Sequence, residues 1–275
     1  MRRCLVPIAL ALIVLSPSLR AWGGVGHHAV ARIAQSRLTP ATQQAVTSVL
    51  GTEDFVLSAT WADEVRSARP ESYNWHFVDI PYAETKYDAA RDCPATERGD
   101  CVIAAIARFR QTLGNPSADA VARREALKFI IHFVGDLHQP LHSIDLKDRG
   151  GNDVKVQADA GRTTNLHSVW DGGAISRRGL DEDAYVRLLL DDLKAHPVTA
   201  SDERVDVVRW VEDAHKIGVA DVYNFPGFVP TGPPATPVTL DDAYYKRAQT
   251  AIDRQLQLAG ARLAALLNET LSPAR

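Results

Sequence analysis

Long hydrophobic runs are almost absent from this sequence. The one marked run, Leu5–Leu15, is too short to span a bilayer, which argues against a membrane-spanning protein. Arg2 and Arg3 precede the run, and small and polar residues follow it up to Ala21. A basic start, an apolar centre and a small-residue end predict a secretory signal peptide, residues 1–21, cleaved after Ala21. The alternative is an uncleaved amphipathic anchor.

Cysteine is also scarce, with three in 275 residues. Cys4 lies in the predicted signal peptide, which leaves Cys93 and Cys101 with seven residues between them. In an exported chain, an even pair this close predicts a local disulfide. A cysteine metal site is the weaker alternative, because the pair is not a tight C-x-x-C and the loop between is rich in charge.

Neither sign of charge dominates the chain. The whole sequence has 31 basic and 34 acidic residues, a formal net charge of −3. Three arginines lie within the signal peptide, so the predicted mature chain has 28 basic against 34 acidic residues, a charge of −6. A mildly acidic surface excludes an electrostatic clamp for duplex DNA. If the protein acts on a polyanion, local cations must balance the charge.

Strand patterns and internal repeats are few as well. Only Asn152–Gln157 alternates clearly, and it predicts a short hairpin with Arg162–Leu166. Most of the remaining chain has helical spacing of apolar residues. The helical patterns cover Gly26–Leu38, Val102–Leu113, Arg123–His142, Asp181–Ala195, Ser201–Ala220 and Leu240–Leu267. Because the proline-rich loop Pro226–Pro237 marks no domain boundary, we predict one all-α domain, residues 22–275, with a minor β-hairpin.

Histidine and aspartate, in contrast, recur in short motifs along the whole chain. The motifs are W-G-G-V-G-H from Trp22 to His27, W-A-D ending at Asp63, W-H-F-V-D from Trp75 to Asp79, H-F-V-G-D-L-H-Q-P-L-H from His132 to His142, and H-S-V-W-D from His167 to Asp171. Imidazole and carboxylate are the ligands that zinc takes in hydrolytic sites. The series therefore predicts a site that holds several zinc ions.

Helix geometry supports this prediction. His132 and Asp136 lie four residues apart, so both side chains reach the same face of a helix. His167 and Asp171 repeat the spacing on a second helix. One H-x-x-x-D pair is a weak signal, but two pairs with a further Asp-His set and an N-terminal W-G-x-x-G-H are a strong one.

With these motifs in place, the chain resembles the zinc-dependent single-strand-specific nucleases and 3′-nucleotidases of fungi, plants and bacteria. That family shares its compact helical fold with bacterial zinc phospholipase C. The resemblance runs from Trp22 to about Asn268. It includes G-G-N at Gly150–Asn152, C-V-I-A-A-I from Cys101, and the closing L-D-D-A-Y-Y and Q-L-x-L-A-G-A-R-L-A-A-L-L-N segments.

The resemblance implies three zinc ions with defined ligands. The first set is Asp63, His76, His132 and Asp136. The second set is the α-amino and carbonyl groups of Trp22, the side chain of His27, and Asp136 as a bridge. The third set is His142, His167 and Asp171. An α-amino group has a pKa near 8, so zinc can displace its proton only after signal cleavage frees it.

The family resemblance also implies the reaction. A hydroxide shared by two zinc ions is expected to attack phosphorus in line with the departing 3′ oxygen, while the third zinc neutralises charge. The expected substrates are single-stranded DNA and RNA, cut to 5′-mononucleotides, and 3′-nucleotides, which lose their phosphate. The sequence implies no stable protein partner and no membrane, and it predicts a secreted or periplasmic enzyme.

Three further residues carry expectations about the reaction. Asp79 is expected to orient the attacking water as a catalytic carboxylate; otherwise it is a solvated surface residue. Phe77 is where the family stacks a nucleobase, which accepts any unpaired base, whereas its alternative is a place in the core. Asn152 in G-G-N either contacts substrate or only stabilises a turn.

Two other functions remain open on the sequence. Zinc phospholipase C has the same fold and metals, but its third set ends in glutamate where this chain has Asp171. No Trp- or Leu-rich loop predicts membrane insertion. A non-catalytic secreted zinc-binding protein would fit the helical pattern, yet it leaves Phe77 and Asp79 beside the ligands unexplained.

Overall fold

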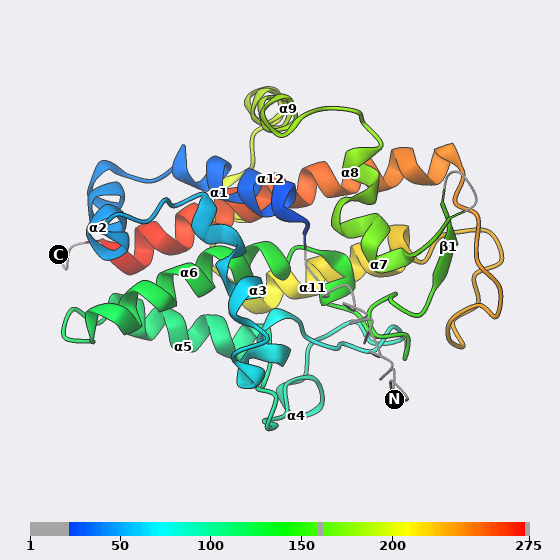
Figure 1. The fold of residues 1–275 in the computed structure, drawn as a ribbon, viewed down its shortest axis with the longest axis horizontal. Coiled ribbons are helices and arrows are strands. Elements are labelled where there is room, and N and C mark those ends of the chain that lie inside the picture. Colours follow the sequence, from blue (N-terminus) through cyan, green and yellow to red (C-terminus); the bar gives the residue numbers. More distant parts are fainter. Residues whose placement is uncertain (1–21, 159–161, 273–275) are drawn as a thin grey trace, which may run out of the picture.

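The computed structural model describes residues 22–158 and 162–272, so the predicted signal peptide lies outside the described residues. Helices form almost all of the regular structure, which confirms the predicted all-α class (Figure 1). The helices are α1 Gly24–Gln35, α2 Pro40–Leu50, α3 Trp61–Val65, α4 Ala89–Asp92, α5 Val102–Gly114, α6 Ala120–Asp136, α7 Leu166–Ser168, α8 Ala174–Ser176, α9 Glu182–Ala195, α10 Ala200–Glu203, α11 Val207–Ile217 and α12 Asp242–Leu271. Short 3₁₀ turns are η1 Leu57–Thr60, η2 Pro70–His76 and η3 Pro140–His142, and π turns are η5 Val169–Gly173 and η6 Gly218–Val222.

Helix α12 crosses the molecule and supports the rest of the bundle. Asp241 caps its first turn by accepting a hydrogen bond from the Tyr244 amide at 2.7 Å. In its first half one side faces the core, with Tyr244, Ala248 and Ile252 buried at helical spacing. Nearly every residue from Gln255 to Leu267 is buried, so the second half is enclosed. Helix α1 packs along it, and α5 pairs with α6 nearby (Figure 1).

Helix α6 runs through the centre of the protein. Every residue from Ala126 to Asp136 is buried. The predicted helix reached His142 with Pro140 as its end, but α6 stops at Asp136. Gln139 is extended, with φ −80° and ψ 114°, because a residue before proline avoids the helical region, and Pro140 then begins η3. The chain therefore turns sharply between Asp136 and His142.

Two other predicted helices are shorter than expected. Ser201–Ala220 was predicted as one helix, but Arg204 adopts ψ 129° and separates α10 from α11. Asp206 then caps α11 by accepting from the Arg209 amide at 3.1 Å, which starts a new helix rather than continuing the old one. The helix predicted over Gly26–Leu38 ends at Gln35.

The predicted hairpin and disulfide are both present. Strands β1 Lys155–Gln157 and β2 Thr163–Asn165 pair antiparallel, with Lys155 opposite Asn165. Cys93 and Cys101 form a disulfide in the segment before α5, which confirms the predicted pairing. Within residues 22–158 and 162–272, the protein has no helix with the length and hydropathy that crossing a membrane requires.

Candidate metal centre

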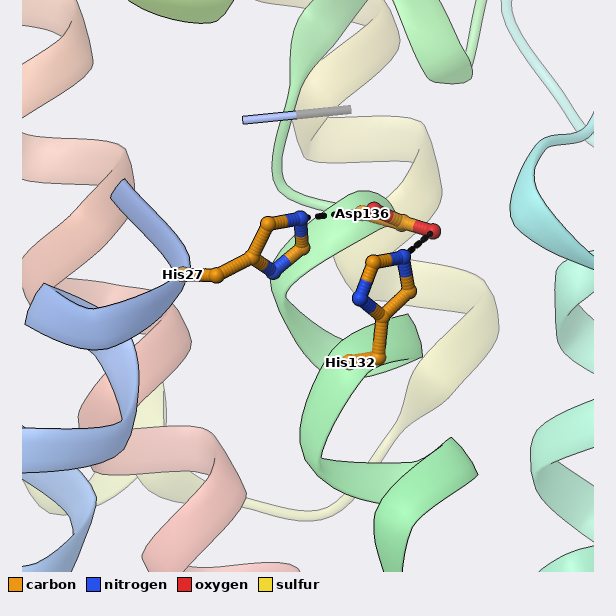
Figure 2. Close-up of side chains that lie close together, drawn as sticks. All are labelled: His27, His132 and Asp136. Atoms are coloured by element: carbon orange, nitrogen blue, oxygen red, sulfur yellow. Dashed lines mark ion pairs between the residues drawn. The ribbon is translucent and has the colours of Figure 1, made fainter. Parts of the chain in front are cut away.

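Helix α6 presents two candidate ligands into the protein core. His132 and Asp136 lie one turn apart near its end, and both are fully buried. His27 approaches from α1, so that its ring stacks on the His132 ring with centroids 4.1 Å apart. Figure 2 shows His27 and His132 pointing toward Asp136 from the two helices. Gly135 permits this approach, because a Cβ there would lie 2.9 Å from the His27 Nδ1 atom.

Asp136 is the centre of the arrangement because its two oxygens face different histidines. Its Oδ1 lies 3.4 Å from the His27 Nε2 atom. Its Oδ2 lies 3.1 Å from His132 Nε2 and 2.9 Å from His76 Nδ1. One carboxylate can therefore serve two neighbouring cations, as its predicted role requires.

A second group surrounds the other side of Asp136. Asp63 in α3 places its Oδ1 atom 3.7 Å from both His76 Nδ1 and His132 Nε2. His132 Nδ1 donates to the Ala59 carbonyl at 2.6 Å, which fixes the ring and leaves Nε2 toward the group.

A third group forms where η3 meets α7 and η5. His142 Nε2 lies 3.3 Å from His167 Nε2, and that atom lies 3.4 Å from an Asp171 oxygen. Backbone carbonyls orient both rings: His142 Nδ1 contacts the His76 carbonyl and His167 Nδ1 contacts the Gly150 carbonyl, each at 2.7 Å. The His76 contact joins the third group to the second.

The donor set fits metal ions better than it fits hydrogen bonding alone. Within each group the candidate ligand atoms lie no more than 4.8 Å apart. The groups are His27 with His132 and Asp136, Asp63 with His76 and His132, and His142 with His167 and Asp171. Several of these buried atoms have no hydrogen-bond partner: both ring nitrogens of His27, His76 Nε2, and one oxygen each of Asp63 and Asp136. Unpaired buried polar atoms are costly, and bound cations would satisfy them. We call these residues the metal-ligand cluster.

Burial and neighbouring charges shift the pKa values of the cluster, and three of its histidines are kept in the form that binds metal. Burial lowers the pKa values of His27, His76 and His142 well below the ordinary value, so their rings are neutral and able to bind metal. Burial raises the pKa of Asp171 well above its ordinary value, because a lone carboxylate is poorly solvated there. Burial would lower the pKa of His132 as well, but the carboxylates of Asp136 and Asp63 raise it to about 9.

Trp22 lies against the same cluster. Its side chain is fully buried, and its indole Nε1 donates to the Gly135 carbonyl at 2.9 Å. The next residue, Gly23, donates its amide to the Asp171 carbonyl at 2.8 Å. The start of the predicted mature chain is thus tied both to the end of α6 and to the third group.

A pocket of about 490 Å³ opens beside the third group. Its lining includes His142 and His167, together with three residues singled out in the sequence: Phe77, Asp79 and Asn152. Phe77 is only partly buried and is no member of the buried core, which favours a contact with substrate over the core alternative. Asn152 donates to the Arg149 carbonyl at 2.8 Å, so it stabilises a turn and also lines the pocket.

Asp79 lies in this pocket and outside the three metal groups. Asp79 is an exposed residue, as its surface alternative required, but protein atoms crowd its carboxyl group and raise its pKa to about 7, and the nearby charges of Asp145 and Asp92 add to the rise. A carboxyl with this pKa can gain or lose a proton near neutral pH, which suits an acid–base role.

Two residues of the site were missed by the sequence analysis. Gln139 donates its side-chain amide to an Asp171 oxygen at 2.7 Å and accepts from the Leu141 amide, so it fixes a candidate ligand. Arg66 lines the pocket three residues after Asp63, and it donates to the Tyr73 carbonyl at 2.9 Å. Only the position of Gln139 next to the ligand motif, and of Arg66 one turn beyond Asp63, could have indicated them.

His138 shows why sequence position alone does not select ligands. It falls between Asp136 and His142 in the motif, yet its ring contacts the Val134 carbonyl and the Arg262 guanidinium at 2.7 and 2.9 Å. It belongs to none of the three groups found among the described residues. After the end of α6, the His138 side chain therefore points toward Arg262 and not toward the metal-ligand cluster.

Comparison with known proteins agrees with this geometry. The family model for S1/P1 nucleases matches residues 22–272. The chain belongs to the S1/P1 nuclease family. It is therefore a hydrolase that acts on phosphodiester bonds of nucleic acids.

Curated relatives resemble this nuclease over nearly its whole length. Endonuclease 2 of Arabidopsis thaliana is 31% identical over 95% of this chain and 94% of its own. Nuclease P1 of Penicillium citrinum is 31% identical over 90% of this chain and 97% of its own. Nuclease S1 of Aspergillus oryzae is 38% identical over 61% of this chain and 59% of its own.

Proposed function

We propose that this nuclease is an exported, zinc-dependent enzyme that cuts single-stranded DNA and RNA to 5′-mononucleotides and removes phosphate from 3′-nucleotides. The observation that carries the proposal is a pocket lined both by His142 and His167 of the buried histidine–aspartate cluster and by the partly exposed ring of Phe77. The cluster would act on phosphate, and the ring would select an unpaired base.

Nine residues would hold three zinc ions. They are Trp22, His27, Asp63, His76, His132, Asp136, His142, His167 and Asp171. Zinc is favoured because the donors are nitrogen and carboxylate oxygen in small buried sets, rather than the all-oxygen sets that magnesium and calcium take. When bound, such ions lower the pKa of water toward neutrality and balance phosphate charge.

The remaining side chains of the pocket would bind and orient substrate. Asp79 accepts a hydrogen bond or a proton from water or from the bound nucleotide, as its pKa of about 7 allows. Arg66 supplies a positive charge in the pocket, next to the acidic Asp63. Its planar guanidinium matches two oxygens of one phosphate.

Selectivity for single strands follows from Phe77. Its ring is open to the pocket and meets the Tyr73 ring edge-on, with centroids 6.2 Å apart. A base can stack on this ring only when it is unpaired, and every base offers a π face, so the contact is tolerant of sequence. Asn152 sits on the same pocket wall and would hydrogen-bond the stacked nucleotide.

Export is supported by the sequence and by two structural features. The disulfide between Cys93 and Cys101 is stable in an oxidising compartment, which favours the periplasm or the outside of the cell. The contacts of the Trp22 indole with the Gly135 carbonyl and of the Gly23 amide with the Asp171 carbonyl support a mature N-terminus whose amino group would serve as a ligand.

The lipid-hydrolysing alternative gains no support from the surface. The exposed large hydrophobic residues of the described chain are Leu57, Val121, Leu180, Val208 and Val229. None of them lines the pocket beside the third group. Family membership also sets the non-catalytic alternative aside.

The proposal is tested by hydrolysis of denatured and native DNA with the mature protein. We expect rapid release of 5′-mononucleotides from denatured DNA, slow attack on the duplex, and loss of both after chelation. Zinc should restore activity, and elemental analysis should find three zinc ions per chain. Hydrolysis that is unchanged by chelation, or equal rates on both DNA forms, would contradict it.

A further inference from the structure

Cations outnumber carboxylates in the lining of the pocket. The lining has four basic side chains, Arg66, Arg98, Lys147 and Arg149, against two acidic ones, Asp79 and Asp145. Arg98, Lys147 and Arg149 are exposed, and we call this part of the lining the outer wall. The protein as a whole is acidic, so this local excess of positive charge is a departure from the rest of the chain. An excess of cations in a cleft attracts a polyanion.

Arg98 differs from the other two exposed cations in how it is held. No ion pair is found among the described residues for Arg98 or Lys147, whereas Arg149 pairs with Asp153 at 2.7 Å. The Arg98 guanidinium carbon lies 3.6 Å from the centroid of the Tyr73 ring. Stacking on an aromatic face holds the guanidinium plane in place and leaves its N–H edge available. Arg98 is therefore a restrained cation without a counter-charge.

The loop that carries Arg98 is built to hold it there. The disulfide from Cys93 to Cys101 closes the loop, and Thr96 and Gly99 exchange backbone hydrogen bonds at 3.1 and 3.2 Å. Gly99 has φ +97°, and a Cβ there would lie 2.5 Å from the Glu71 carbonyl oxygen, so only glycine fits. The loop is thus packed tightly against η2, the turn that contains Tyr73.

Tyr73 links this loop to the site of reaction. Its ring meets Phe77 edge-on and lies 4.1 Å from the Arg66 guanidinium carbon as well. The Asn74 amide donates to the Arg98 carbonyl at 2.9 Å, which fixes the backbone of the loop next to the same turn. Arg98 is exposed, in contrast to the buried metal-ligand cluster. It belongs to the outer part of the pocket and lies beyond the residues that would hold the reacting phosphate.

We propose that Arg98, held on the Tyr73 ring, binds a phosphate of the substrate strand other than the one being hydrolysed, and so makes the enzyme favour oligonucleotides over single nucleotides. The inference rests on the proposed nuclease and 3′-nucleotidase function. A 3′-nucleotide has one phosphate, which the metal-ligand cluster would take. A strand carries further phosphates, and only those can reach a cation at the outer wall.

The test compares one substrate of each kind. Arg98→Ala should raise KM for a single-stranded oligothymidylate by about three- to tenfold and leave KM and kcat for a 3′-nucleotide unchanged. The slope of log KM against log salt for the oligonucleotide should fall by about 0.7, the value for one phosphate contact on a single strand. Arg98→Lys keeps the charge and should keep the slope. Tyr73→Phe keeps the ring and should behave as the wild type.

Lys194→Ala is the matched control, because Lys194 is an exposed cation on α9 whose partner is Asp191. This variant should change neither the KM for either substrate nor the slope of log KM against log salt. If Arg98→Ala lowers kcat/KM for both the oligonucleotide and the 3′-nucleotide, Arg98 acts on the reacting phosphate or on the fold. That result would overturn the proposal. An unchanged salt slope would overturn it as well.

Binding separates this inference from the proposed function. Anisotropy of a labelled phosphorothioate oligothymidylate, which resists cleavage, is measured with the zinc-loaded protein. A lower salt slope for Arg98→Ala supports the phosphate contact even if hydrolysis of 3′-nucleotides fails. An equal slope, or no binding by the wild type, refutes the contact even if the enzyme cleaves DNA.

Discussion

The metal-ligand cluster and the outer wall of the pocket are built in opposite ways. The cluster comes from α1, α3, η2, α6, η3, α7 and η5, and most of its side chains are buried. The outer wall comes from two loops. The disulfide between Cys93 and Cys101 closes the first, and in the second Lys147 and Arg149 adopt left-handed backbone conformations with φ of 59° and 55°. Buried helices fix the donor atoms closely, whereas exposed loops can vary in sequence without disturbing them. The chemistry and the choice of substrate are thereby separated.

The cost of this design lies in the cluster. Buried nitrogen and oxygen atoms of the cluster that lack hydrogen-bond partners destabilise a protein that holds no metal. Such strain is typical of functional sites, where binding of the missing ligand compensates for it. The charges of the outer wall are exposed to water, so they cost less free energy of folding than the buried atoms of the cluster do.

The largest effect is expected at the centre of the cluster. Asp136→Asn removes a charge that faces His27 with one oxygen and His132 with the other. Loss of a neighbour of a ligand costs about 10–100-fold in metal affinity or activity, so loss of the ligand itself should exceed about a hundredfold. We expect activity to disappear and at least one zinc ion to be lost, as measured by steady-state kinetics and elemental analysis.

Asp253→Asn is the matched control for that variant, since Asp253 accepts from the Tyr185 hydroxyl at 2.7 Å on α12, outside the cluster. It should retain zinc and activity. Full zinc content and wild-type activity in Asp136→Asn would rule out the bridging role, and circular dichroism would show whether each variant is folded.

An intermediate effect is expected at the aromatic ring of the pocket. Phe77→Ala removes the ring on which an unpaired base would stack, a contact worth about 1–3 kcal/mol per base. We expect kcat/KM on denatured DNA to fall about tenfold while zinc content stays the same. The ratio of rates on denatured and native DNA should fall with it. Phe77→Trp restores a π face and should restore the ratio; if Phe77→Ala keeps the wild-type ratio, Phe77 does not select single strands.

The smallest effect is expected from the acidic pair in the pocket. Asp79 is protonated below its pKa of about 7, so an enzyme that needs its carboxylate gains activity as pH rises to about 7. The charge of Asp145 contributes to that raised pKa, so Asp145→Asn should lower it and shift the acidic limb of kcat/KM toward lower pH.

Two further variants test whether Asp79 is the group that titrates in that pH profile. Asp79→Asn should remove the acidic limb, and the exposed Asp191→Asn on α9 should leave it in place. If the limb stays at the same pH in Asp145→Asn, the titrating group is a different one.

Much of the cluster was predictable because its signals are local. The four-residue spacing of His132 and Asp136 places both on one helical face whatever surrounds the helix. The pairing of Cys93 with Cys101 also follows from a short separation. The outer wall left no such signal: the stacking of Arg98 on Tyr73 joins residues from two segments, and nothing in either segment marks the contact.

The sequence by itself determined the helical class, the disulfide and the two histidine–aspartate pairs at four-residue spacing, because periodicity and spacing are properties of the local chain. The resemblance to the nuclease family implied the other histidines and aspartates of the cluster. Only the tertiary structure decided that Gln139 holds Asp171 and that His138 turns away from the cluster. These outcomes depend on which segments pack against one another. A buried side chain takes its direction from its neighbours in space, and the order of residues does not record them.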